Sequence, residues 1–104
     1  MKQTKLSKHA KDDRPDRILW IATEVGFGQL VDTIQIYNVD RGYRKVELYE
    51  TGVAVVKALD EELVITMYLP TQRQLAVWYG DKNLIPIRLL NVSKHNEKKG
   101  WTNR

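Results

Sequence analysis

The chain has 104 residues, of which 42% are hydrophobic and 29% charged, and these values are ordinary for one globular domain. No apolar run approaches the roughly 18 residues of a membrane span, and no apolar segment follows the basic start, so neither a transmembrane helix nor a secretory signal is expected. The absence of cysteine excludes disulfides, thiolate metal sites and cysteine nucleophiles. We therefore expect a single cytoplasmic domain over residues 1–104, without membrane contact.

The net charge of +4 is unevenly distributed along the chain. Residues 1–11 contain four lysines and no acidic residue, and residues 94–104 contain four basic residues and one acidic residue. Basic ends on a mildly acidic body favour contact with a polyanion, although solvated basic tails produce the same pattern. We expect basic, flexible ends at about residues 1–5 and 99–104.

The first part of the chain predicts N-terminal helices. Ser7 is a suitable N-cap for a short helix, and Pro15 then interrupts it because proline lacks an amide donor. A second helix is expected after Pro15, ending near Gly26–Gly28. Its apolar stripe at helical spacing consists of Ile18, Ile21, Ala22 and Val25.

The middle of the chain predicts a four-stranded antiparallel meander. Its strands are expected at about residues 30–37, 44–49, 53–58 and 63–69. Three-residue loops that end at Gly42 and Gly52 allow apolar residues of successive strands to pair. The expected pairs are Ile36–Val46 and Ile34–Leu48, then Val46–Val56 and Leu48–Ala54, and finally Val56–Ile65 and Ala54–Met67.

This register predicts two different faces, because side chains alternate along a strand. The core face carries Ile34, Ile36, Val46, Leu48, Ala54, Val56, Ile65 and Met67. The opposite face is mixed and carries Gln35, Tyr37, Lys45, Glu47, Tyr49, Val53, Val55, Lys57, Val64, Thr66 and Tyr68.

Two C-terminal helices complete the expected α+β fold. Thr71 is positioned as the N-cap of the first, and Gly80 ends it. The second is expected to start near Pro86 and to end at Gly100, with a fifth strand over 84–90 as the alternative.

The mixed face is the expected binding surface. Lys45 and Lys57 lie directly opposite each other in the predicted register, which is destabilising for like charges. In the structural interpretation, the negative charge of Glu47, diagonal to Lys57, compensates this repulsion. The functional interpretation is that the lysines contact phosphates while tyrosines stack on bases of RNA or DNA. These tyrosines are Tyr37, Tyr49 and Tyr68; the alternative is that helices cover them.

The residues give little support to other chemistry. His9 and His95 are the only histidines, and without a ligand-spacing motif they predict neither a metal site nor a cofactor. Weak catalytic candidates are His9, Arg14 and Arg17 with Lys45 or Tyr68, which would supply a general base and cations for metal-independent RNA cleavage.

Two stretches carry a resemblance to known proteins. The opening L-S-K-H-A-K-D-D-R-P-D-R, residues 6–17, resembles the start of small bacterial and phage proteins of the barnase/RelE-like group. The run T-G-V-A-V-V-K-A-L-D-E-E-L-V-I-T-M-Y-L-P-T-Q-R-Q, within about residues 51–75, resembles uncharacterised phage or prophage proteins of low-GC Gram-positive bacteria. The resemblance implies a helix followed by an antiparallel sheet and a mobile-element setting. Asp13 and Pro15 depart from the helical continuity of the group.

We therefore expect a small phage-encoded binding protein that contacts nucleic acid or a protein of phage or host. The second hypothesis is a RelE/barnase-like metal-independent endoribonuclease. A third is a structural accessory protein that oligomerises through an exposed sheet edge, and the sequence leaves the oligomeric state open.

Overall fold

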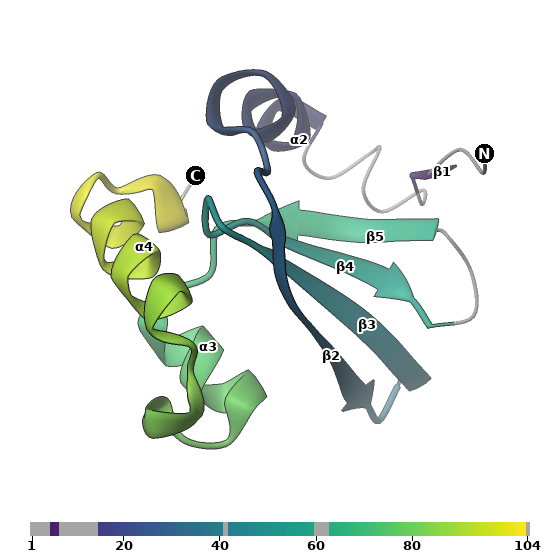
Figure 1. Ribbon diagram of the computed structural model, residues 1–104. Coiled ribbons are helices and arrows are strands. Elements are labelled where there is room, and N and C mark those ends of the chain that lie inside the picture. The colour runs from purple at the N-terminus through teal and green to yellow at the C-terminus, as the bar shows by residue number, and fades with distance from the viewer. Residues whose placement is uncertain (1–4, 7–14, 41, 60–62, 104) are drawn as a thin grey trace.

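A computed structural model describes residues 5–6, 15–40, 42–59 and 63–103 (Figure 1). One sheet has the strand order β1-β5-β4-β3-β2. Its strands are β1 (Lys5–Leu6), β2 (Leu30–Asn38), β3 (Gly42–Tyr49), β4 (Ala54–Ala58) and β5 (Leu63–Tyr68). The helical segments are α2 (Pro15–Trp20), η1 (Ile21–Val25), α3 (Gln72–Tyr79), η2 (Lys82–Leu84), α4 (Ile87–Lys98) and η3 (Trp101–Asn103).

The α+β class and the antiparallel meander of β2 to β5 are confirmed. The C-terminal part forms α3 and α4, so the alternative of a strand over 84–90 is wrong. The sequence did not predict β1, which pairs in parallel with β5 through two residues. The predicted first helix with its Ser7 cap lies outside the described residues.

The two faces of the sheet carry separate hydrophobic clusters. On the first, which we call the helix face, Val46, Leu48, Ala54 and Val56 pack with Leu75 of α3, Ile85, and Leu89 of α4. On the second, which keeps the name mixed face, Val53, Val55, Val64 and Met67 pack with Ile21, and Trp20, Phe27 and Trp101 flank them. Figure 1 shows α3 and α4 together to one side of the sheet and α2 close to β5, away from them. Strand β4 is therefore buried from both sides.

The second hairpin has the predicted register. Val46 lies opposite Val56, and Leu48 lies opposite Ala54. Gly52 has a φ of 90°, a left-handed conformation that glycine adopts without steric cost. The turn between β3 and β4 therefore determines which side chains of the two strands share a face, as the sequence predicts.

The first hairpin differs from the prediction by two residues. Ile34, rather than Ile36, lies opposite Val46. The difference arises because Gly42 pairs with Asn38 as the first residue of β3, instead of lying inside the loop. A shift of two residues keeps each side chain on its own face, so the predicted faces of β2 and β3 remain correct.

Strand β5 contains a β-bulge that the sequence did not reveal. Val56, predicted to pair with Ile65, lies opposite Thr66, whereas the next residue, Lys57, lies opposite Val64. Ile65 is therefore the extra residue, and an extra residue changes the face of every side chain that follows it.

The bulge overturns the predicted face of three residues. Ala54 lies opposite Tyr68, one residue beyond the predicted Met67. Met67 consequently packs in the cluster of the mixed face, and Tyr68 packs against the cluster of the helix face. Thr66 also turns to the helix face, because it lies opposite Val56.

The N-terminal helix changes from α-helical to π-helical hydrogen bonding halfway along. After α2 the chain forms a π-helical turn, η1, in which the Gly26 amide donates to the Ile21 carbonyl at 2.7 Å, five residues back. Ile21 is fully buried, whereas Ala22, predicted on the same stripe, is exposed. The wider π turn also places Trp20 against Trp101, with ring centroids 5.6 Å apart.

Helix α4 docks onto the sheet through polar as well as apolar contacts. Ser93 and Asn96 are each only 1% exposed. The Ser93 hydroxyl donates to the Pro70 carbonyl at 3.0 Å, and the Asn96 amide donates to the Thr51 carbonyl at 3.1 Å. Each bond satisfies a buried polar group. Together they attach α4 to Thr51, before β4, and to Pro70, after β5.

Candidate functional site

The helical segments cover only part of the mixed face. The apolar cluster with Ile21 lies over β4 and β5, whose residues are buried. Toward the free edge of the sheet, Thr33, Gln35 and Tyr37 of β2 and Tyr43 of β3 are exposed, and Lys45 is half-buried. These five side chains share one face because Thr33 lies opposite Glu47, Gln35 opposite Lys45 and Tyr37 opposite Tyr43.

Two aromatic rings stand together on this uncovered area. Tyr37 and Tyr43 face each other across β2 and β3, with ring centroids 4.9 Å apart and planes inclined by 56°. They are 61% and 58% exposed. Large aromatic side chains normally bury most of their surface, so a paired and exposed set of rings is a functional signal rather than a packing requirement.

Two lysines lie side by side next to the rings, as the sequence predicts. Lys45 lies directly opposite Lys57. The Lys57 ammonium contacts the Glu47 carboxylate, with Nζ and Oε1 3.0 Å apart. Their side chains are only 10% and 14% exposed. The predicted compensation by Glu47 is therefore confirmed, because the carboxylate neutralises the lysine that is buried.

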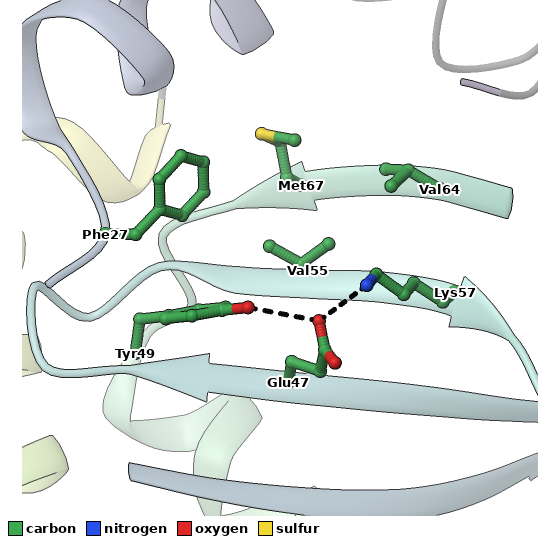
Figure 2. Close-up of a pocket in the computed structure, with 7 residues that line it drawn as sticks. All are labelled: Phe27, Glu47, Tyr49, Val55, Lys57, Val64 and Met67. Carbon is green, nitrogen blue, oxygen red and sulfur yellow. Dashed lines mark hydrogen bonds and ion pairs between the residues drawn. The ribbon is translucent and has the colours of Figure 1, made fainter. Parts of the chain in front are cut away.

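The same carboxylate oxygen has a second donor. The Tyr49 hydroxyl donates to Glu47 Oε1 at 3.1 Å, and the Tyr49 ring meets the Phe27 ring edge-on with centroids 5.4 Å apart. Figure 2 shows Tyr49 and Lys57 approaching Glu47 from opposite sides. This fixes the position of the carboxylate at the boundary between the uncovered area and the buried cluster.

A cavity of about 230 Å³ adjoins this polar triad. Its lining, drawn in Figure 2, consists of Phe27, Glu47, Tyr49, Val55, Lys57, Val64 and Met67. We call it the Glu47 pocket. Apolar walls with a few converging polar groups are typical of sites for planar organic ligands. The pocket has the composition to receive an aromatic ring whose polar edge meets Glu47 and Lys57.

Tyr68 does not belong to this surface. Because of the bulge in β5 it lies on the helix face, where its ring centroid is 6.0 Å from that of Trp78. The Arg17 guanidinium lies 5.6 Å from the centre of the Tyr68 ring and donates to the Thr66 hydroxyl at 3.1 Å. The prediction that Tyr68 lies on the mixed face is therefore wrong.

The structure thus brings together two of the four catalytic candidates, Arg17 and Tyr68. The other two, His9 and Arg14, lie outside the described residues, so the ribonuclease hypothesis stays a prediction. Lys45, the alternative to Tyr68 in that hypothesis, lies on the opposite face of the sheet from Tyr68.

Tyr68 is expected to remain protonated well into the alkaline range. Burial raises the pKa of Tyr68 from 10.0 to about 12, and the Arg17 charge only partly offsets this. Between these two values the unfolded chain loses the proton first, so the free energy of unfolding should fall as the pH rises and should be insensitive to Tyr68 at lower pH. At neutral pH the hydroxyl is a donor and not a base.

Ultraviolet titration of tyrosinate formation, compared with a Tyr68→Phe variant, measures this pKa. The difference between the two curves should appear near pH 12. A Tyr68 contribution at the ordinary value of 10.0 would show that the hydroxyl is solvated and that its packing against Trp78 is wrong.

Two residues of the site are additional to those predicted. Tyr43 was placed outside the strands, because the second strand of the meander was expected to begin after it. In the structure β3 begins at Gly42, so Tyr43 belongs to the strand and pairs with Tyr37. Phe27 was interpreted only as part of a helix end, whereas its ring forms a wall of the Glu47 pocket. A turn placed one residue earlier would have identified Tyr43 from the sequence; no local signal identifies Phe27.

Metal and membrane chemistry receive no structural support within the described ranges. Among these residues, no group of three histidine, cysteine, aspartate or glutamate side chains is arranged to hold a metal ion. No helix in this part of the chain is long and apolar enough to cross a membrane. The His95 ring packs edge-on against Trp101, with centroids 6.1 Å apart.

Comparison with known proteins gives no family. No protein-family model, curated protein or solved structure matches this chain. The functional argument therefore depends on the geometry of the mixed face.

Proposed function

We propose that the protein binds single-stranded nucleic acid on the uncovered part of its mixed face. The observation that carries this proposal is the exposed pair of Tyr37 and Tyr43, which are 61% and 58% exposed. Aromatic rings on a sheet surface provide stacking platforms for unpaired bases, and every base has a face that can stack. Single strands fit such a surface because their bases are accessible, unlike those of a duplex.

Charge beside the rings supports the same ligand. Lys45 lies next to Tyr43 on β3, separated from it by one residue that points to the other face. The chain carries a net charge of +4. A lysine at this distance from the stacking platform contacts the phosphates that connect the stacked bases.

The Glu47 pocket extends this surface inward. It begins at Lys57, which lies opposite Lys45, and at Glu47, two residues after Lys45 on β3. A base that leaves the stack at Tyr43 would find apolar walls at Val55 and Met67 and hydrogen-bonding groups at Glu47. The proposal does not depend on the phage resemblance, which concerns only where such a protein is encoded.

The decisive experiment measures fluorescence anisotropy of labelled single-stranded RNA and DNA oligonucleotides as the protein is added. Binding is expected at low salt and should weaken as salt rises, because phosphate contacts release counterions. Replacing both Tyr37 and Tyr43 by alanine should weaken binding by about 10-fold to 100-fold, since stacking contributes roughly 1–3 kcal/mol per base. The matched control, Tyr37→Phe with Tyr43→Phe, keeps the rings and should bind nearly as the wild type.

A Lys45→Ala variant separates the charge from the rings. It should lower the slope of log affinity against log salt by about 0.7, the value for one phosphate contact on a single strand. Absence of binding at low salt, or equal binding by the double alanine variant, would reject the proposal. In the first case the remaining candidate would be a partner protein, and in the second the nucleic acid would bind elsewhere on the chain.

A further inference from the structure

The outer edge of β2 is the longest strand edge that the described part of the fold leaves without a neighbour. β2 spans nine residues, Leu30–Asn38, and is the last strand of the sheet on the side opposite β1. Among the described residues, no segment pairs with its outer side. Every second residue of such an edge presents backbone amide and carbonyl groups that can bond another strand.

The usual protections of an edge strand are nearly absent here. β2 contains no proline and no lysine, and its single charge is Asp32. The Asp32 carboxylate accepts hydrogen bonds from the Tyr79 hydroxyl at Oδ2, 2.6 Å away, and from the Thr33 backbone amide at Oδ1, 2.9 Å away. The only irregularity in the pairing of β2 with β3 is a bulge at one end, between Leu30 and Asp32. Over the rest of its length the strand is regular, and a partner strand would replace Asp32 at the Thr33 amide.

The exposed side chains that the structure describes along β2 are uncharged. At one end Leu30, opposite Tyr49 and therefore on the mixed face, is 51% exposed. At the other end Tyr37 is 61% exposed, and Val39, the residue following the strand end, is 85% exposed. Between them on the same face lie two exposed, uncharged polar residues, Thr33 and Gln35. Apolar ends flank a polar centre.

We propose that β2 pairs antiparallel with β2 of a second copy of the chain, about a two-fold axis near Ile34. In this register Leu30 of each copy lies opposite Asn38 of the other, so the two strands pair along their whole length. Thr33 of each copy then lies opposite Gln35 of the other, where their side chains can form hydrogen bonds.

The pattern favours a second copy over an unrelated peptide. A two-fold axis requires a surface to complement itself, and the uncharged centre of β2 allows this. The pairing opposes no like charges, because Asp32 of each copy lies opposite Ile36 of the other. The product is a continuous antiparallel sheet that carries the tyrosine pair of each copy on one face. The inference is independent of nucleic-acid binding, since it uses the backbone edge.

Sedimentation equilibrium of the wild-type protein tests the proposal. The expected particle has twice the chain mass of 12.1 kDa. The variant Thr33→Lys with Gln35→Lys places four lysines around the axis and should sediment as a monomer, because like charges would face each other. Both positions are exposed, so the fold should be retained, and circular dichroism checks this.

The matched control adds the same charge elsewhere. Asn83→Lys with Asn91→Lys changes two exposed residues of the helical layer and should remain a dimer. A monomeric wild type would overturn the proposal, and so would a dimer that persists in the Thr33→Lys, Gln35→Lys variant. Neither result would affect the binding experiment with Tyr37 and Tyr43.

A second measurement locates the interface directly. The chain contains no cysteine, so a single spin label at Gln35→Cys reports only distances between two copies. Two such labels should lie within about 20 Å, since paired strands are only about 5 Å apart. A label at Asn91→Cys should report a longer distance. The reverse order would place the contact on the helices and overturn the pairing of β2.

Discussion

Replacing Glu47 by alanine is expected to lower the free energy of unfolding by about 2–4 kcal/mol. The substitution removes the Glu47 carboxylate that contacts the Lys57 ammonium, whose side chain is 10% exposed. The ammonium would remain beside Lys45, directly opposite on β3, and would lose the charge of Glu47. The estimate is below the full cost of an unpaired buried charge because the Glu47 side chain is 14% exposed, so some water reaches the pair. Urea denaturation measures the change.

Two controls distinguish burial from charge pairing in general. Arg88→Ala breaks the ion pair with Glu50, whose side chains are 60% and 39% exposed, and should cost less than about 1 kcal/mol. Replacing the buried pair as a whole, Glu47→Leu with Lys57→Met, should leave stability within about 1 kcal/mol of the wild type or above it. If Glu47→Ala costs no more than Arg88→Ala, the pair is solvated and the Glu47 pocket is not a built site.

Replacing Gly52 by alanine should destabilise the fold by about 3–5 kcal/mol. Its φ of 90° disfavours any side chain, and a Cβ would lie within 2.4 Å of the Asn96 amide nitrogen. Asn96 is 1% exposed and donates to the Thr51 carbonyl, so displacing it leaves a buried amide without its partner. The turn would lose both its conformation and its contact with α4. Thermal and urea unfolding both report this loss.

Gly42 provides the matched comparison for this turn. Its φ is 77°, but a Cβ there would meet nothing within 4 Å. Gly42→Ala should therefore cost only the left-handed backbone term, about 1–2 kcal/mol. Equal effects of the two alanine variants would mean that α4 does not rest on the turn after β3. A larger effect at Gly42 would place the critical turn in the first hairpin.

The sequence predicted the meander because the positions of its glycines and the alternation of apolar and polar residues indicate the same strands and turns. Gly52 permits one loop length that keeps Val46 and Val56 on the same face, and the structure has this register. The bulge at Ile65 was not predictable in the same way. Both registers of β5 bury apolar residues, since Ile65 packs against the helix face in either one and Met67 is buried on the mixed face instead of the predicted one. The π-helical turn after Trp20 likewise depends on tertiary contact, with Trp101 at the far end of the chain.

The candidate site was predicted in part. The opposition of Lys45 and Lys57, and the compensation by Glu47, follow from the register alone and are confirmed. The face of Tyr68 was wrong because it depends on the bulge. The strongest feature, the pairing of Tyr37 with Tyr43, needed the first turn to be placed one residue earlier than predicted, a precision that the hydrophobic pattern does not provide. The role of these residues in binding stays a prediction.

The most direct test of the proposed function is an amide chemical-shift titration with a short single-stranded oligonucleotide. The largest changes should occur at Tyr37, Tyr43 and Lys45, with smaller ones at Glu47 and little change along α4. The result would hold in either oligomeric state, because these side chains lie on a sheet face and not on the paired edge. Changes concentrated on the lysines of α4, or no changes at all, would contradict the assignment of the mixed face as the binding surface.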